Sequence, residues 1–166
     1  MATNIFRRPR AGAARLLIYI LIFTGIAVAL NGWIFSGGAI AWSRGLAQPG
    51  WAPGGVVIGS VWVGLFGLMA AALWFVDRSD DPARKGPARA LILLQYLVSV
   101  SWTGLYFGLQ SVAAGFWTTI VATLLCVVAT WAAFRASTAA GVLLVPLLAW
   151  LGFAVALAWS VWRLNA

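Results

Sequence analysis

The chain has 166 residues, of which 63% are hydrophobic and only 8% are charged, so little of it remains for a soluble domain. Its formal charge of +8 could suit a nucleic-acid partner, but the basic residues gather at the ends of apolar runs and do not follow one face. We therefore expect no nucleic-acid binding. With no histidine, one cysteine and three acidic residues, the chain lacks the usual ligands of a metal site.

Five long apolar runs are separated by short polar breaks. Each run is long enough to cross a hydrocarbon core, which takes about 20 helical residues. The runs do not alternate polar and apolar residues as the strands of a membrane β-barrel do. The sequence therefore predicts an all-α integral membrane bundle of five transmembrane helices, in one domain over residues 1–166. The predicted helices cover about residues 16–41, 56–76, 88–109, 112–134 and 140–162.

The first run could also belong to a signal peptide, because basic residues precede it and Ala39-Ile40-Ala41 resembles a cleavage site. Its apolar stretch is longer than the roughly 7 to 15 residues of a signal-peptide core. We expect it to be retained as the first membrane helix.

The breaks differ in character. The first, about Trp42–Gly55, contains two prolines and four glycines, which oppose a regular helix. Its two tryptophans favour a folded lid over the bundle mouth, and an interfacial anchor loop is the alternative. The break at Asp77–Pro87 holds every acidic residue and predicts a solvated turn. The last two breaks are a few residues long, which makes the last three helices antiparallel neighbours.

Lysine and arginine are distributed unevenly between the two ends of the predicted bundle. Nine fall at the end that holds the N-terminus, and only Arg44 and Arg163 fall at the other. The positive-inside rule then predicts a cytoplasmic N-terminus and an external C-terminus. The nine are Arg7, Arg8, Arg10, Arg15, Arg78, Arg84, Lys85, Arg89 and Arg135.

Pairs of small residues four positions apart mark helix faces that can pack closely in lipid. They are Gly55 with Gly59, Gly104 with Gly108, and Gly152 with Ala156. Each pair could pack inside the bundle or form an interface between chains, and Gly104 with Gly108 is the candidate contact for a homodimer or a larger complex. Pro146 predicts a kink in the fifth helix, and Cys126 is expected to be a buried packing residue.

The usual parts of catalysis and ion conduction are missing, because no charged residue lies in the central part of a predicted helix. Hydroxyl groups remain, but no base is placed to activate them, so we expect them to bond to backbone carbonyls or neighbouring helices. These hydroxyl residues are Ser99, Ser101, Thr103, Thr118, Thr119 and Thr123.

Eleven tryptophans exceed what anchoring in a membrane requires. An interfacial belt accounts for the seven that lie toward helix ends, which are Trp33, Trp42, Trp74, Trp117, Trp131, Trp159 and Trp162. Trp62, Trp102 and Trp150 lie deeper, so they are candidates for lining a cavity, with core packing as the alternative. Such a cavity would suit a flat, apolar, conjugated ligand such as a porphyrin, a carotenoid or a sterol-like molecule.

Several motifs then occur in the order of a known family. The first loop has Trp42, Leu46, Gln48-Pro49, Trp51 and Pro53; the second helix has Trp62, Leu65-Phe66 and Met69; the third has Gln95, Trp102 and Tyr106-Phe107-Gly108; the fifth has Ala140-Gly141-Val142-Leu143, Pro146 and Trp150. The chain closes on Arg163-Leu164-Asn165. Over about residues 15–165 it resembles the tryptophan-rich sensory proteins, also called the translocator or peripheral benzodiazepine receptor family.

The resemblance implies a five-helix bundle, often a homodimer, with a pocket beneath the first loop that binds porphyrins and other apolar ligands. On this chain the implied ligand-binding residues are Trp51, Pro53, Trp62, Gln95, Ser99, Trp102, Trp150 and Ala154. Several polar positions of the family pattern are replaced, by Ser43, Gln48, Gly54, Ser99, Leu147 and Ala158. Porphyrin photodegradation, proposed for some members, maps to Ser43, Trp62, Trp150 and Ala154, where Ser43 stands in place of tyrosine. We therefore expect no enzymatic activity.

Two functions remain. The first is a non-enzymatic membrane binding or sensory protein, with a tetrapyrrole or carotenoid-like molecule as its ligand. The second is a structural or assembly subunit of a larger membrane complex, such as one that carries pigments, and in this case the pocket has decayed. In either case we expect an integral protein of a bacterial inner membrane, in contact with the lipid bilayer.

Overall fold

The computed structural model describes residues 12–166, which are almost entirely helical and contain no strand. The elements are α1 (Ala13–Ser36), α2 (Gly38–Arg44), α3 (Gly55–Asp77), α4 (Pro82–Thr103), the π-helical η1 (Gly104–Gly108), α5 (Val112–Ala136) and α6 (Thr138–Asn165). Five of the helices, counting α4 with η1 as one span, are long and apolar enough to cross a membrane. The all-α, five-span bundle predicted from the sequence is confirmed. Arg7, Arg8 and Arg10 lie outside the described residues.

Polar side chains cap the N-terminal ends of α4, α5 and α6. The hydroxyl of Ser111 accepts a hydrogen bond from the backbone N–H of Ala114, and that of Ser137 accepts one from Ala140. The carboxylate of Asp81 does the same at the start of α4. These caps satisfy N–H groups that a helix leaves unpaired in its first turn. Between the caps, the helix bonds satisfy the backbone, as the hydrocarbon core requires.

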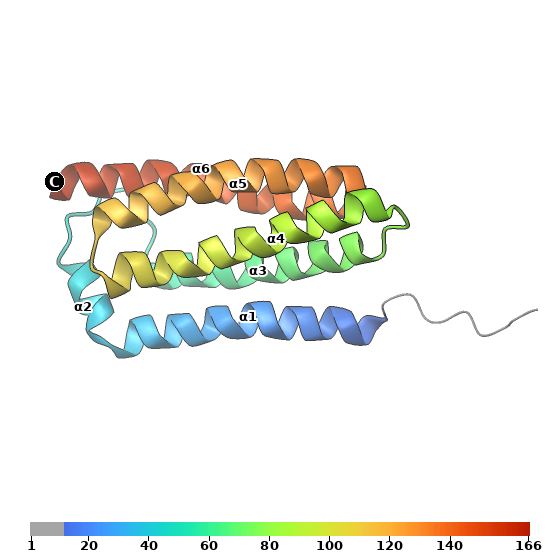
Figure 1. Cartoon of the computed structure of the whole chain (residues 1–166). Coiled ribbons are helices and arrows are strands. Elements are labelled where there is room, and N and C mark those ends of the chain that lie inside the picture. The colour runs from blue at the N-terminus through green and yellow to red at the C-terminus, as the bar shows by residue number, and fades with distance from the viewer. Residues whose placement is uncertain (1–11) are drawn as a thin grey trace, which may run out of the picture.

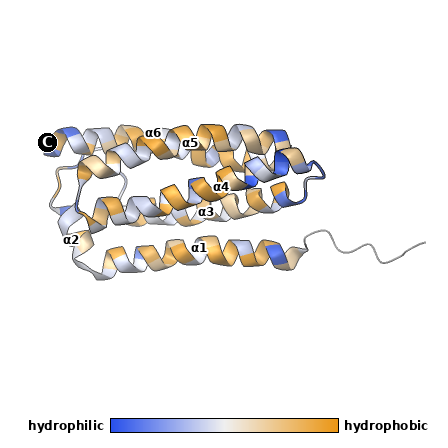
Figure 2. Cartoon of the chain, in the orientation of Figure 1, coloured by the Kyte–Doolittle hydropathy of each residue, from blue (hydrophilic) through white to orange (hydrophobic). Residues whose placement is uncertain are grey.

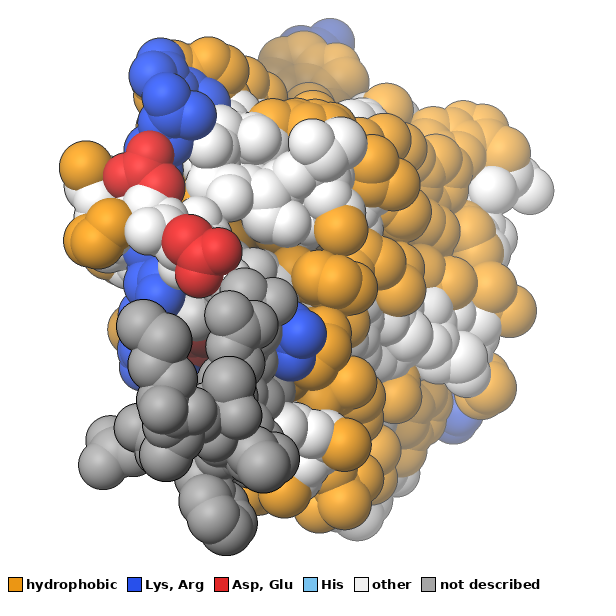
Figure 3. All heavy atoms as spheres, turned by 90° about the vertical axis from the view of Figure 1, so that its right-hand side faces the viewer, with side chains coloured by type: hydrophobic (Ala, Val, Ile, Leu, Met, Phe, Trp, Pro, Cys, Tyr) orange, Lys and Arg blue, Asp and Glu red, His pale blue; other side chains and the backbone are white. Residues whose placement is uncertain are grey.

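The five long helices lie side by side (Figure 1). Helix α3 packs against α1, α4 and α6, while α5 packs against α4 and α6. The short helix α2 lies at the end of the bundle where α6 finishes, and the α3–α4 turn lies at the opposite end (Figure 1). We call these the α2 end and the turn end. Hydrophilic residues gather at the turn end (Figure 2), and the view onto that end shows basic and acidic side chains together (Figure 3).

The half of the bundle toward the turn end is solidly packed. Met69, Leu73, Ile92 and Leu144 are each at most 2% exposed and come from three different helices. A polar contact closes this half, because the hydroxyl of Tyr19 donates to a carboxylate oxygen of Asp77 at 2.6 Å and Arg89 Nη1 lies 3.2 Å from the other oxygen. The contact of Tyr19 and Arg89 with Asp77 ties α1, α3 and α4 together. Cys126 is fully buried on α5, as expected for a small packing residue.

The first predicted helix was wrong at its C-terminal end. Residues 16–41 were predicted to form one helix, but α1 ends at Ser36 and Gly37 is extended, with φ −116° and ψ −177°. A side chain at Gly37 would lie 3.3 Å from the carbonyl oxygen of Trp33, so the tight change of direction suits glycine. Helix α2 then carries Trp42, Ser43 and Arg44, which the sequence placed in a loop.

The third predicted helix, residues 88–109, was wrong at both ends. Helix α4 already begins at Pro82, because Asp81 caps it, and regular α-helix stops at Thr103. From there the chain forms a π-helical turn, with the N–H of Leu109 bonded to the carbonyl of Gly104 and that of Ser111 to Tyr106. Helix α6 is also longer than predicted and continues through Pro146, whose kink stays a prediction.

The small-residue pairs divide between the interior and the surface. Ideal Cβ atoms at Gly55 and Gly59 would meet Phe35 and Asn31 of α1, so this pair packs inside the bundle. Gly104 and Gly152 have no neighbour within 4 Å of that position. The hydroxyls of Ser101, Thr118, Thr119 and Thr123 donate to carbonyls of their own helices, as expected.

A tryptophan-lined cavity beneath the first loop

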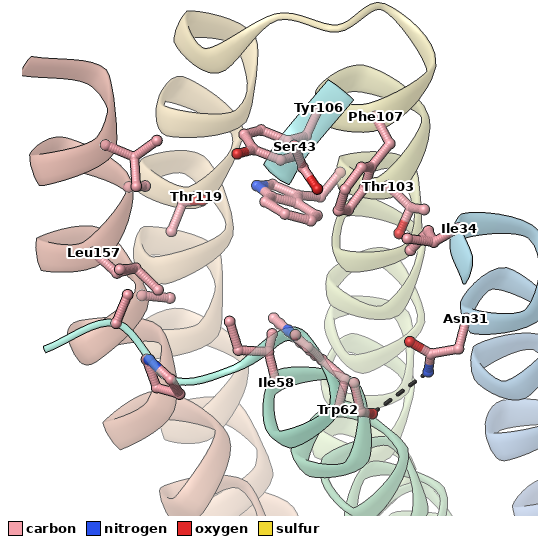
Figure 4. Close-up of a pocket in the computed structure, with 18 of the residues that line it drawn as sticks. Asn31, Ile34, Ser43, Ile58, Trp62, Thr103, Tyr106, Phe107, Thr119 and Leu157 are labelled. Carbon is pink, nitrogen blue, oxygen red and sulfur yellow. Dashed lines mark hydrogen bonds between the residues drawn. The ribbon is translucent and has the colours of Figure 1, made fainter. Parts of the chain in front are cut away.

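A cavity of about 490 Å³ opens at the α2 end of the bundle. Residues of α1, α2, α3, α4, η1, α5 and α6 form its walls (Figure 4). The loop of residues 45–54 covers it and adds Gln48, Pro49, Ala52, Pro53 and Gly54 to the lining. We call this loop, residues 45–54, the lid. The volume of the cavity falls within the ~300–1,000 Å³ that is usual for small-molecule sites.

Three indole rings come to the cavity from three helices. Trp102 of α4 stacks on Tyr106 of η1, with ring centroids 4.7 Å apart and planes 10° from parallel, and its Nε1 donates to the carbonyl of Gly115 at 3.0 Å. Trp62 of α3 lies opposite, at the level of Asn31 (Figure 4). Trp150 of α6 lies 5.1 Å from Phe153, and its Nε1 is buried without a hydrogen-bond partner among the described residues.

The polar groups of the lining are mostly used within the protein. The hydroxyl of Ser43 donates to the carbonyl of Ile40, and that of Thr119 donates to Gly115. Asn31 Nδ2 makes a long contact of 3.5 Å with the carbonyl of Gly59 (Figure 4). No aspartate or glutamate is among the lining residues that the structure describes, and residues 12–166 contain no cluster of metal ligands. The lining therefore offers a surface for binding, without a nucleophile beside a general base.

Six of the eight predicted site residues line the cavity: Pro53, Trp62, Ser99, Trp102, Trp150 and Ala154. Gln95 lies one helical turn behind the wall, where its Nε2 donates to Ser99 Oγ at 3.3 Å and its Oε1 is buried without a partner. Trp51 is 51% exposed on the lid, and its ring lies 5.7 Å from that of Phe153. These two residues thus touch the wall of the cavity but do not form it.

Several lining residues were absent from the prediction. Tyr106 and Phe107 of η1 reach the cavity (Figure 4). The ring of Trp42 on α2 contacts both, with centroid distances of 5.1 and 6.4 Å. Trp42 is thus a packing residue, and its place in an interfacial belt stays a prediction. Asn31 and Arg44 also line the cavity, and an amide within the first apolar run was the available signal for Asn31.

The lid is fixed to the bundle by the last turn of α6. Asn165 Oδ1 accepts a hydrogen bond from the backbone N–H of Ala47 at 2.9 Å, and its Nδ2 donates to the Ala47 carbonyl at 2.9 Å. The same Nδ2 donates to the carbonyl of Val161 within α6. The Trp51–Phe153 ring contact holds the other part of the loop. Two contacts from one helix therefore set the position of the lid.

These features define an integral membrane protein with five spans and an aromatic, ligand-sized cavity at one end. The model of the TspO/MBR family matches residues 17–163, and the chain belongs to this family. The match covers all five spans and the lid.

Individual relatives agree with this assignment. The chain is 32% identical to the tryptophan-rich sensory protein of Cereibacter sphaeroides, over 75% of this chain and 77% of that protein. It is 34% identical to protein CrtK of Rhodobacter capsulatus, over 90% and 94% of the two chains. The human translocator protein is 28% identical, over 78% of each. The match to a sensory-protein family was expected from the loop and helix motifs and is confirmed.

Proposed function

We propose that this protein is a non-enzymatic membrane sensor that holds an apolar, conjugated ligand in the cavity beneath the lid. A tetrapyrrole is the ligand class we put forward first, and a carotenoid-like molecule is the second. The observation that carries the proposal is the meeting of Trp62, Trp102 and Trp150 around one cavity of about 490 Å³. Indole faces offer flat apolar contact area, which a conjugated ring system can cover by stacking.

Two further features support binding over chemistry. The hydroxyls of Ser43 and Thr119 already donate to backbone carbonyls, and no described carboxylate reaches the cavity to activate them. The indole of Trp150 lines the cavity, and its Nε1 is buried without a hydrogen-bond partner among the described residues, so this side chain offers a ligand the apolar part of its ring.

The test is a titration of the purified protein with protoporphyrin IX in mild detergent. Binding should quench the tryptophan fluorescence and shift the main absorption band of the porphyrin. Replacing Trp62, Trp102 and Trp150 together by Phe should weaken binding by about tenfold or more, because each stacked indole contributes roughly 0.5–1.5 kcal/mol.

A matched control removes three other indoles. Trp117, Trp131 and Trp159 are 46–61% exposed and do not line the cavity, so their replacement by Phe should leave the porphyrin affinity unchanged. Equal affinities for the wild type and the Trp62, Trp102 and Trp150 variant would show that the binding site lies elsewhere. Light-dependent loss of the porphyrin above a free-tryptophan control would contradict the non-enzymatic assignment.

The alternative is a structural or assembly subunit of a larger membrane complex, such as one that carries pigments. Ala158 lines the cavity at a position where the family pattern is polar, which favours a decayed pocket. Gly104 is exposed with open space beside it, so a second helix can approach this face closely. That face would serve a homodimer or a larger complex.

Native mass and the absorption spectrum separate the two functions. A binding protein should purify as a monomer or homodimer that takes up porphyrin, whereas a subunit should co-purify with other chains. Replacing Gly104 and Gly108 by Leu should abolish an association through this face. An unchanged native mass in that variant would exclude the face.

A further inference from the structure

Arg44 is the only charged side chain among the described residues that line the cavity. The three aspartates lie at the turn end of the bundle, where Asp77 is bound by Tyr19 and Arg89, and Asp81 by Arg84. The cavity thus carries a positive side chain at its mouth, and none of the three aspartates lies at this end of the bundle.

The Arg44 guanidinium has neither an ion pair nor a hydrogen bond to any residue within 12–166. Arginine can donate five hydrogen bonds in a planar fork, and a carboxylate is the group that fits this fork in a bidentate way. Gln48 of the lid and Ser43 also line the cavity, so neutral polar groups accompany the cation. Arg44 therefore has unused capacity to bind an anion.

The backbone of Arg44 is held firmly although its side chain is exposed. Arg44 is the last residue of α2, and the N–H of Gly45 caps this helix by bonding to the carbonyls of Ala41 and Trp42. The ring of Trp42 packs on Tyr106 and Phe107 of η1. Helix α2 thereby fixes the backbone of Arg44 at the cavity whose aromatic wall Trp102 and Tyr106 help to form.

We propose that the cavity selects amphipathic acids: ligands with a flat apolar body that lies on the indoles and a carboxylate that pairs with Arg44 at the mouth. This inference rests on the proposed function and narrows its ligand class. It favours a tetrapyrrole that carries carboxylates over a carotenoid-like hydrocarbon, because the hydrocarbon leaves the cation without a partner.

The size of the effect follows from the exposure of the mouth. A charge-assisted hydrogen bond is stronger than a neutral one, but water and salt screen a pair at the surface. We expect the acid to bind about fivefold to tenfold more tightly than a neutral ligand of the same shape. Raising the salt concentration should reduce this preference, because the pair is partly screened.

The experiment compares protoporphyrin IX with its dimethyl ester, which has the same ring but no charged carboxylates. Both are titrated into the full-length protein in the same detergent, so that partition into micelles is measured and corrected for each. The wild type should prefer the acid. Arg44→Gln should remove the preference by weakening acid binding alone, while Arg44→Lys, which keeps the charge but loses the fork, should retain part of it.

Arg163 provides the matched control. It is the other described cation at the α2 end, it lies over the ring of Trp159 at 5.8 Å, and it does not line the cavity. Arg163→Gln should keep the full preference for the acid. Folding of each variant is checked by its near-ultraviolet circular dichroism.

The outcomes are distinct. If the wild type binds acid and ester equally, the proposed function stands and the inference about Arg44 is wrong. A preference that survives Arg44→Gln, or that Arg163→Gln removes equally, also overturns the inference. If neither probe binds the wild type, the proposed tetrapyrrole function fails, and the inference falls with it.

Discussion

The side-chain amide of Asn165 holds the lid against α6. It makes three hydrogen bonds, and two of them are to the backbone of Ala47. The two bonds to Ala47 are exposed to water, so each contributes about 0.5–1.5 kcal/mol. Because both Ala47 bonds must break before this part of the loop can leave α6, we expect them to slow the release of a ligand.

Replacing Asn165 by Ala should therefore raise the dissociation rate of bound porphyrin by about fivefold to thirtyfold, with a smaller change in the association rate. Stopped-flow fluorescence after dilution measures both rates. Ser160→Ala is the control, since the Ser160 hydroxyl bonds only to Ala156 of the same helix. If the two variants release porphyrin at the same rate, the lid is not held by Asn165.

At the scale of residues, the sequence predicted the apolar part of the site better than the rest. Trp62, Trp102 and Trp150 are separated by whole helices, yet their depth in apolar runs was enough to bring them into the prediction. Tyr106 and Arg44 were missed because local turns place them: the π-helical η1 rotates the tyrosine inward, and α2 brings the arginine to the mouth. Hydrophobic periodicity carries no signal for either turn.

Among the elements, η1 and α5 meet in a tightly packed joint. A β-carbon at Gly115 would overlap the ring of Tyr106, and the Gly115 carbonyl accepts hydrogen bonds from both Trp102 Nε1 and the Thr119 hydroxyl. Glycine at this position lets the ring of Tyr106 lie against α5, which in turn supports its stack on Trp102.

Gly115→Ala should destabilise the protein by about 1–3 kcal/mol, because the added methyl group has no space unless Tyr106 moves. The near-ultraviolet circular dichroism of the Trp102–Tyr106 stack should weaken as well. Gly152→Ala in α6 is a matched change, since nothing lies within 4 Å of its β-carbon position, and we expect a neutral or slightly stabilising effect. Equal melting temperatures for the two variants would contradict this account.

The five spans were predictable as elements, and their internal irregularities were not. Apolar runs long enough to cross a bilayer predict the spans, and the N-cap residues Asp81, Ser111 and Ser137 mark where α4, α5 and α6 begin. The break at Gly37 lies within an apolar stretch, so composition alone gives no reason to end α1 there. The π-helical turn that begins at Gly104 also lies within an apolar stretch of sequence. In the structure it contacts α2 and α5.

For the whole molecule, charge predicts orientation. The described cations at the turn end are Arg15, Arg78, Arg84, Lys85, Arg89 and Arg135, and those at the α2 end are Arg44 and Arg163. In a bacterial inner membrane the turn end should therefore face the cytoplasm, and the lid should face outward. Reporter fusions to the C-terminus should give a periplasmic signal. A cytoplasmic signal there would reverse the assignment and place the lid inside.

The cavity ends halfway along the bundle. Its deepest lining residues include Phe66, Ser99 and Leu151. One or two helical turns closer to the turn end, the side chains of Met69, Ile92 and Leu144 are each at most 1% exposed. The molecule is thus shaped as a cup and not as a tube. A ligand that enters under the lid must leave on the same side of the membrane, so occupancy can report a concentration there, whereas net movement across the bilayer would require the packed half of the bundle to come apart.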